Sequence, residues 1–321
     1  MLAATGTLAL LTLFGAITSW LLLAMTFVIG LGLTLHVPAW QASIPELVPR
    51  QQLSRAIALG SVNFNLARAS GPAVAGSLVA ITGAWIAFSF NAISFAGVIL
   101  VLLFWRRDRS ESTRGLSFRL SLFQGLRYVY RTTEMRHVLI RVALFIVPAA
   151  ALWGLLPLVA RERLNWGADG FGVLVTCVGA GAVIAARFLP AIQRYSGSDR
   201  TISNAMVLFA IGLVVMGAST NRIIVSAATL VMGFGWMMTL TTLNTAAQMT
   251  LRSRMRARGM SCYLTAMALS MSAGSFLWGT VAESIGIGLA QQIAAGCVVF
   301  TAAIGLAFRV TPSSNLLRHG R

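Results

Sequence analysis

The sequence contains no lysine and only eight acidic residues among its 321 positions, whereas all 25 of its basic residues are arginine. Charged residues make up 10% of the chain and hydrophobic residues 57%. An ordinary soluble domain carries about 25% charged residues, so this composition excludes that class. The net charge of +17 does not indicate nucleic-acid binding, because the arginines lie between apolar runs and form no basic face.

Cysteine and histidine are scarce as well, with three of each. None of them has a spacing typical of a metal or redox site. No nucleophile elbow, phosphate loop or H-E-x-x-H pattern occurs either. The sequence therefore predicts no metal, no cofactor and no enzymatic activity. The segment Gly179-Ala180-Gly181 is predicted to serve tight helix packing and not nucleotide binding.

Long apolar runs dominate the chain instead. A spanning helix needs about 20 apolar residues to cross about 30 Å of hydrocarbon. Residues 1–16 are apolar but shorter, and we interpret them as part of a further helix. The sequence thus predicts an all-α integral membrane protein with about 10 transmembrane helices, counting one for residues 1–16. The nine full-length segments are approximately 20–43, 53–80, 84–105, 138–159, 170–192, 201–219, 222–249, 259–282 and 286–309.

The arginine positions predict the orientation. Alternate loops, taken together with the C-terminal tail, hold 21 of the 25 arginines. The opposite loops hold Arg161, Arg163 and Arg222, and Arg68 is left at mid-membrane. Because cytoplasmic loops are enriched in arginine, we predict a multi-pass cell-membrane protein, embedded in the lipid bilayer, with its C-terminus in the cytoplasm.

The sequence also matches itself at an offset of 203 residues. Five glycines coincide with glycines at this offset, where chance gives roughly one, and Arg55 matches Arg258. The repeat predicts two related bundles, residues 1–105 with four helices and residues 137–321 with six helices and a short tail. On a plan of two equal halves, the first bundle lacks two N-terminal helices. The glycine pairs are Gly30/Gly233, Gly32/Gly235, Gly71/Gly274, Gly76/Gly279 and Gly83/Gly286.

Residues 106–136 form a charged cytoplasmic linker between the bundles. Part of it carries an apolar stripe at helical spacing beside several arginines. This pattern fits a helix lying on the anionic inner membrane surface, and it also fits a short helix packed on the bundle. The stripe consists of Phe118, Leu122, Phe123, Leu126 and Val129, and the arginines are Arg119, Arg127 and Arg131.

Several short motifs occur in both halves of the chain. Those of the first half are Pro38-Ala39-Trp40-Gln41-Ala42, Pro45-Glu46-Leu47-Val48-Pro49, Asn63-Phe64-Asn65-Leu66-Ala67-Arg68, Gly71-Pro72 and Asn91-Ala92-Ile93-Ser94-Phe95. Those of the second half are Gly125-Leu126-Arg127-Tyr128-Val129, Leu243-Asn244-Thr245-Ala246 with Gln248, Arg258-Gly259, and Gly274-Ser275 with Trp278-Gly279. Together they resemble the major facilitator superfamily, in the branch that contains the enterobactin exporter and the transmembrane secretion effectors. The resemblance implies a major facilitator-type bundle with four helices of the first half and six of the second.

The superfamily has a signature turn of the Gly-x-x-x-Asp-Arg type between its second and third helices. In the first half this turn would precede Met1. The second-half counterpart, Arg187 to Arg200, is degenerate but keeps Arg194, Gly197 and Asp199 together with Arg200.

Arg68 is the first candidate for a transport residue, because the surrounding segment, Leu53 to Ile81, is almost entirely apolar or small. A charge near the bilayer midplane costs at least about 2.5–3.5 kcal/mol, so it usually faces a partner or a water-filled cavity. Ser61, Asn65 and Arg68 are spaced i, i+4 and i+7 and therefore share a helix face. The stripe predicts contact with a substrate or counter-ion. The alternative is a structural arginine that bonds backbone carbonyls or a neighbouring helix.

Other polar residues at membrane depth are weaker candidates. Asn91, Asn244 and Gln248 are predicted to make either interhelical hydrogen bonds or substrate contacts. His36 could relay protons near neutral pH or simply lie at the interface, and Arg141 is predicted to snorkel to the surface. All eight carboxylates fall in loops or at helix ends, so proton coupling stays open.

A glycine-rich signature ending in Gly-Pro is typical of the fifth helix of proton-coupled exporters in the superfamily. Gly71, Pro72 and Gly76 match it, and Gly274 and Gly279 are the glycine mates in the second half. The resemblance implies a gating or leak-sealing role, with ordinary close helix packing as the alternative.

The sequence as a whole predicts a secondary transporter that exports a small amphipathic or siderophore-like compound. Alternating access would operate around a cavity between the two bundles, near the membrane midplane. The alternatives are an inactive, N-terminally truncated fragment and a non-transporting membrane scaffold or sensor.

Overall fold

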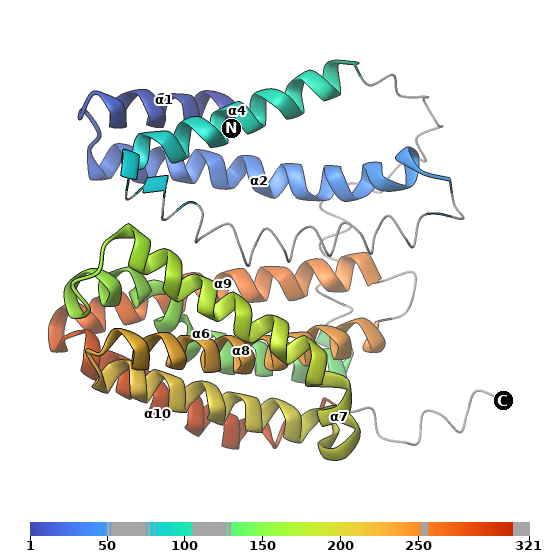
Figure 1. Ribbon diagram of the computed structural model, residues 1–321. Helices are drawn as coiled ribbons and strands as arrows, with labels where there is room; N and C mark the ends of the chain where they lie inside the picture. Colours follow the sequence, from blue (N-terminus) through green and yellow to red (C-terminus); the bar gives the residue numbers. More distant parts are fainter. Residues whose placement is uncertain are drawn as a thin grey trace. The chain divides into compact units, whose positions relative to one another are not determined.

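The computed structural model describes residues 1–49, 52, 75, 78–79, 81–104, 127, 130–251 and 256–310 (Figure 1). Every regular element within these ranges is a helix. The chain divides into two compact units, residues 1–112 with 167–173, and residues 113–166 with 174–321. Because most of the linker 106–136 lies outside the described residues, the boundaries 1–105, 106–136 and 137–321 stay predictions, as does its amphipathic helix.

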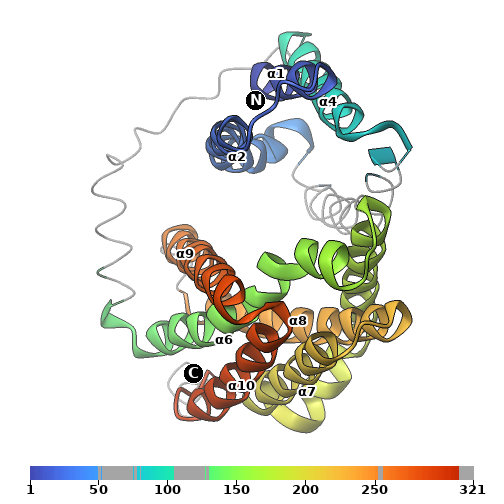
Figure 2. The same cartoon turned by 90° about the vertical axis from the view of Figure 1, so that its left-hand side faces the viewer.

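The first unit contains α1 (Leu2–Leu13), α2 (Ser19–Leu47) and α4 (Ala84–Phe104). The hydroxyl of Thr18 caps α2 by accepting a hydrogen bond from the Leu21 N–H at 3.3 Å. In Figures 1 and 2, α1 runs beside α4, and a buried face of α1 that includes Ala4 and Leu8 accounts for this packing. In contrast, α4 has no buried residue.

The second unit is a bundle of α6 (Thr133–Leu158), the π-helix η2 (Val159–Arg163), α7 (Ala168–Ala218), α8 (Arg222–Thr250), α9 (Arg256–Ile285) and α10 (Ile287–Gly305). Figures 1 and 2 show these helices gathered together, and α6 packs against α8, α9 and α10. The helix α7 reverses direction at Gly197, whose φ of 69° and ψ of 166° suit glycine. Across this turn Ala185 and Leu189 join Ala205 in one buried cluster.

Small residues set the spacing of the helices in this bundle. A side chain at Gly181 would collide with the carbonyl of Leu230, and one at Gly233 would collide with the carbonyl of Val178. The backbones of α7 and α8 therefore approach each other closely at two points, which is how helices gain packing energy without a hydrophobic drive in lipid. This confirms a packing role for Gly181.

The 203-residue repeat is confirmed by the positions of the helices. Shifted by 203 residues, α2 covers 222–250, which are the bounds of α8. The turn residues agree as well, because Gly83 and Gly286 have φ values of 91° and 87°. Both residues begin a helix, α4 or α10, in a conformation that strongly favours glycine. The repeat therefore conserves backbone conformation as well as glycine.

Six helices within the described ranges are long and apolar enough to cross a membrane. One of them is α7, whose two halves contain the predicted segments 170–192 and 201–219. The all-α membrane fold is thus present, while the number of about 10 transmembrane helices is not confirmed. The six are Ala84–Phe104, Thr133–Arg163, Ala168–Ala218, Arg222–Thr250, Arg258–Ile285 and Ile287–Gly305.

Candidate functional site

The predicted polar stripe and the Gly-Pro signature lie outside the described residues. Their roles in substrate contact and gating therefore stay predictions. The residues concerned are Ser61, Asn65, Arg68, Gly71, Pro72 and Gly76.

Two further candidates lie in the first unit. His36 is half-buried on α2, and Asn91 is exposed on α4. A hollow of about 490 Å³ in the same unit includes neither of them, and its lining is apolar. Nothing in the described part of this unit gathers polar side chains around a common point. The hollow is lined by Trp40, Leu47, Leu100, Val101, Leu102 and Phe104.

The second unit brings two predicted residues together on α8. The Gln248 side-chain N–H2 donates a hydrogen bond to Asn244 Oδ1 at 2.6 Å. This bond joins positions i and i+4 of one helix, and the predicted interhelical bonds or substrate contacts of the two residues stay predictions. The hydroxyl of Tyr263 on α9 lies near the Asn244 side chain but forms no hydrogen bond with it. A polar group thus spans α8 and α9. It consists of Asn244 and Gln248 from α8 and Tyr263 from α9.

An aromatic cluster lies along the same stretch of α8. Trp236 is 5.4 Å from Phe145, 5.8 Å from Trp153 and 6.1 Å from Phe209, measured between ring centroids. Edge and tilted contacts at these distances stabilise aromatic pairs. The cluster comes from α6, α7 and α8 and fixes their relative positions.

Three buried polar atoms on α6, α8 and α9 have no hydrogen-bond partner in the described part of the chain. They are Trp153 Nε1, Thr239 Oγ1 and Tyr263 Oη. Thr239 follows Trp236 by three residues, so the two share a face of α8. A buried polar group without a partner costs about 1–3 kcal/mol. Unpaired buried polar groups are typical of ligand-binding sites. The facing parts of α6, α8 and α9 are therefore the strongest candidate for a ligand-binding site in the second unit.

The two predicted glycines of α9 have different surroundings. A side chain at Gly274 would collide with the Val147 carbonyl, and the Ala150 Cβ is 2.7 Å from the position that a Cβ would take. The Trp278 indole N–H donates to the same Val147 carbonyl at 2.9 Å, which ties α9 to α6. Gly279 has open space around its missing side chain. The structure thus places Gly274 at a close helix crossing and Gly279 away from one.

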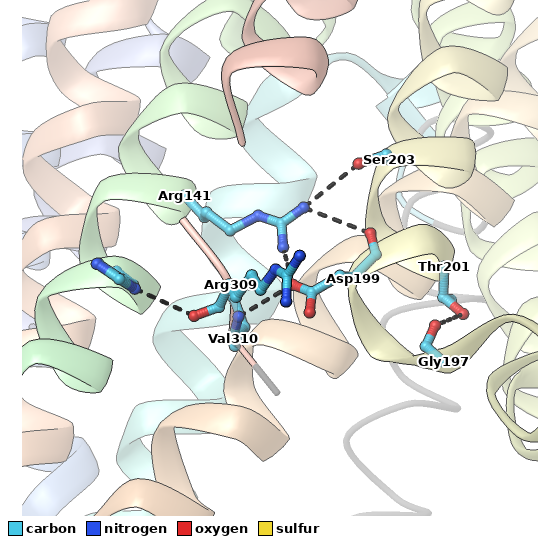
Figure 3. Close-up of polar contacts among 8 residues, drawn as sticks. Arg141, Gly197, Asp199, Thr201, Ser203, Arg309 and Val310 are labelled. Carbon is cyan, nitrogen blue, oxygen red and sulfur yellow. Dashed lines mark hydrogen bonds and ion pairs between the residues drawn. The ribbon is translucent and has the colours of Figure 1, made fainter. Parts of the chain in front are cut away.

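Arg141 is buried, which overturns the prediction that it snorkels to the surface. Arg141 as a whole is 2% exposed. Figure 3 shows its guanidinium directed at Asp199 in the turn of α7. Arg141 donates to the Asp199 carboxylate and, at 3.4 Å each, to the Asp199 carbonyl and Ser203 Oγ. Snorkelling is unnecessary because the turn of α7 supplies a counter-charge beside α6.

The same carboxylate also holds the end of α10. The Val310 N–H donates to Asp199 Oδ1 at 3.0 Å, and the imidazole Nδ1 of His137 lies 3.1 Å from the Arg309 carbonyl (Figure 3). We call the group Arg141, Asp199, His137 and Val310 the end clamp. It joins α6, the turn of α7 and the segment after α10. Asp199 belongs to the degenerate signature turn, and that membership is the sequence signal that could have found the clamp.

At the opposite end of the bundle, two of the three predicted non-cytoplasmic arginines bond backbone carbonyls. Arg163 in η2 donates to the Met216 and Gly217 carbonyls at 3.1 and 2.7 Å, at the C-terminus of α7. Arg222 donates to the Leu164 and Asn165 carbonyls at 3.2 and 2.8 Å. A cation at a helix C-terminus is favourable because the last carbonyls have no helical partner. Both arginines therefore have a structural role.

No group of three or more potential metal-ligating side chains occurs among the residues that the structure describes. Sequence reasoning missed Trp153, Thr239 and Tyr263, because Trp, Thr and Tyr are ordinary residues in an apolar helix. Only the packing of α6, α8 and α9 reveals that their polar atoms are buried without partners.

Comparisons with known proteins agree with this fold. The profile of the transmembrane secretion effector family matches residues 1–318. The "Staphyloferrin A transporter" of Staphylococcus aureus (strain NCTC 8325 / PS 47) is 24% identical over 196 residues, which are 61% of this chain and 49% of that protein. The match thus spans about half the length of this curated relative.

Among solved structures, a POT family transporter in complex with 5-aminolevulinic acid has the same fold. The TM-score is 0.69 at 17% identity, covering 95% of this chain and 81% of that one. Both named proteins are described as transporters, and the family model matches nearly the whole of this chain.

Proposed function

Because the chain belongs to the transmembrane secretion effector family, we propose that it acts as a secondary transporter that moves a small amphipathic or siderophore-like compound outward. The family supports transport as such, and the name of the staphyloferrin A transporter supports a siderophore-like cargo. The two units would be the two bundles of an alternating-access cycle, in which each moves nearly as a rigid body. Transport activity, direction and cargo all belong to this proposal.

The observation that carries the proposal is the set of buried polar atoms without partners on α6, α8 and α9. Trp153 and Tyr263 offer donors, and the Asn244 side chain lies beside Tyr263. The Trp236 and Trp153 rings next to them provide an apolar surface. Aromatic rings beside a few convergent donors suit an amphipathic cargo with oxygen acceptors.

The test is export from inverted vesicles or proteoliposomes that contain the 321-residue chain, with a panel of siderophores and amphipathic organic acids. Arg68→Ala should reduce flux to the level of empty vesicles while the chain stays in the membrane. Tyr263→Phe should lower flux by about 5–30-fold, the equivalent of 1–2 kcal/mol for one lost hydrogen bond. Cys297→Ala is the control, and its flux should be unchanged. Wild-type flux in Arg68→Ala would remove that residue from the proposal.

The alternative functions predict no flux. An inactive fragment and a membrane scaffold or sensor remain candidates because the match spans only 49% of the relative. If the 321-residue chain gives no flux but a form extended by the upstream in-frame codons transports, the hypothesis of an inactive fragment is correct. If neither form moves any compound of the panel, a scaffold or sensor is favoured. Proton coupling is tested in the same vesicles by imposing a pH gradient.

A further inference from the structure

Three exposed arginines are sequence neighbours of residues in the end clamp of the second unit. Arg136 precedes His137, Arg200 follows Asp199, and Arg309 precedes Val310. Each arginine is thus adjacent in sequence to a residue that the clamp holds. Since the clamp joins three separate segments through the contacts His137–Arg309 and Asp199–Val310, it also brings these arginines to one end of the bundle.

The charge of this surface is almost entirely positive. The Asp199 carboxylate is turned inward to Arg141 and is therefore partly neutralised. Glu134, half-buried in the first turn of α6, is the other carboxylate near these arginines in the described part of the chain. Arg136 bonds Thr133 Oγ1 at 3.2 Å and lies 5.8 Å from the Tyr130 ring. For Arg200 and Arg309, no described residue accepts a hydrogen bond from the guanidinium.

The surface stands at the edge of exposed apolar helix faces. Counting from Arg200, Val207, Ile211 and Val214 follow at i+7, i+11 and i+14, so they share its face of α7, and they are 40, 53 and 45% exposed. The exposed Phe300 of α10 and the exposed Leu306, which directly follows α10, precede Arg309. Apolar faces that end in arginine mark the boundary between hydrocarbon and headgroups.

We propose that Arg136, Arg200 and Arg309 form a binding surface for the headgroup phosphates of anionic phospholipids. The acyl chains lie along the exposed faces of α7 and α10, and the phosphate lies among the three guanidinium groups. Arginine suits this role because its planar fork of N–H donors matches phosphate oxygens. The end clamp holds the three backbone segments in place before the lipid arrives. This proposal is independent of the transported compound.

The test uses the full chain in detergent micelles, with phosphatidylglycerol and phosphatidylcholine as probes and native mass spectrometry to measure the bound lipid. Arg200→Gln with Arg309→Gln should weaken phosphatidylglycerol binding roughly 25-fold, from about fivefold for each arginine near the membrane surface. Phosphatidylcholine binding should stay unchanged. Both side chains are exposed, so the variant should fold.

Arg187→Gln with Arg194→Gln is the matched control. These two arginines are also exposed on α7 and carry the same charge, but neither is adjacent to the end clamp. The control should lose less than about twofold, because the proposed phosphate contacts do not include these two arginines and exposed charges farther than a Debye length are largely screened. An equal loss in both double variants would mean that the general positive charge binds the lipid, and it would overturn the proposed surface. So would displacement of phosphatidylglycerol by millimolar inorganic phosphate, because the site would then bind the phosphate group alone.

Discussion

Replacing either partner of the Arg141–Asp199 pair should destabilise the second unit, and the two replacements should differ in size. The Arg141 side chain is 1% exposed and the Asp199 side chain 21%. The residue left behind decides the cost, because an unpaired charge is more expensive where water cannot reach it. Asp199→Ala leaves a guanidinium in the core and also removes the acceptor of the Val310 N–H. Arg141→Met leaves a carboxylate that water can partly solvate.

The expected values follow from this asymmetry. Asp199→Ala should lower the free energy of unfolding by about 3–5 kcal/mol, the cost of breaking a buried ion pair from one side. Arg141→Met should cost about 1–3 kcal/mol. The double variant should be more stable than Asp199→Ala alone, because no buried charge is left without a partner.

Reversible unfolding of the purified chain in mixed micelles, titrated with sodium dodecyl sulfate and followed by tryptophan fluorescence, measures these values. Arg161→Met is the control, because this exposed arginine has no partner in the described part of the chain, and it should change stability by less than about 0.5 kcal/mol. The reasoning is wrong if Arg141→Met costs as much as Asp199→Ala, or if the double variant loses the sum of both.

Two further predictions concern packing and capping. Gly274→Ala should lower the free energy of unfolding by about 1–3 kcal/mol, because the new methyl group would force α9 away from Val147 and Ala150. Gly279→Ala, the control, should be neutral or slightly stabilising. Equal effects of the two variants in the same unfolding titration would contradict the close crossing at Gly274. Arg163→Ala should lower the free energy of unfolding by about 1–3 kcal/mol, because the Met216 and Gly217 carbonyls lose their donor. Arg161→Ala, at an exposed position, should be near neutral. An equal loss of stability in Arg161→Ala would show that positive charge at this end matters more than capping.

The sequence predicted features that depend on local pattern. Apolar runs indicated membrane helices, and the glycine matches indicated a repeat that places Gly83 and Gly286 in the same left-handed conformation. Local pattern is sufficient here because a left-handed turn strongly favours glycine wherever it occurs. The number of about 10 transmembrane helices is not confirmed. One described helix, α7, contains two predicted segments on either side of Gly197.

Features that depend on contacts between distant residues were not predictable in the same way. Arg141 and Asp199 are 58 positions apart, and only the reversal at Gly197 brings the carboxylate beside α6. The spacing of Asn244 and Gln248 allowed a bond within one helix, and the structure contains that bond. Their predicted interhelical bonds or substrate contacts stay predictions. The stripe of Ser61, Asn65 and Arg68 lies outside the described residues, so its role stays a prediction from the spacing of the residues.

The end clamp also has a consequence for the order in which the second unit is built during synthesis. Arg141 leaves the ribosome first and Asp199 much later, and the Val310 N–H that also donates to the Asp199 carboxylate is made after the whole of α10. A nascent chain that stops within α10 can pair the two charges but cannot close the clamp. The chain must therefore be made through α10 before the segment after Gly305 can tie α6 to the turn of α7.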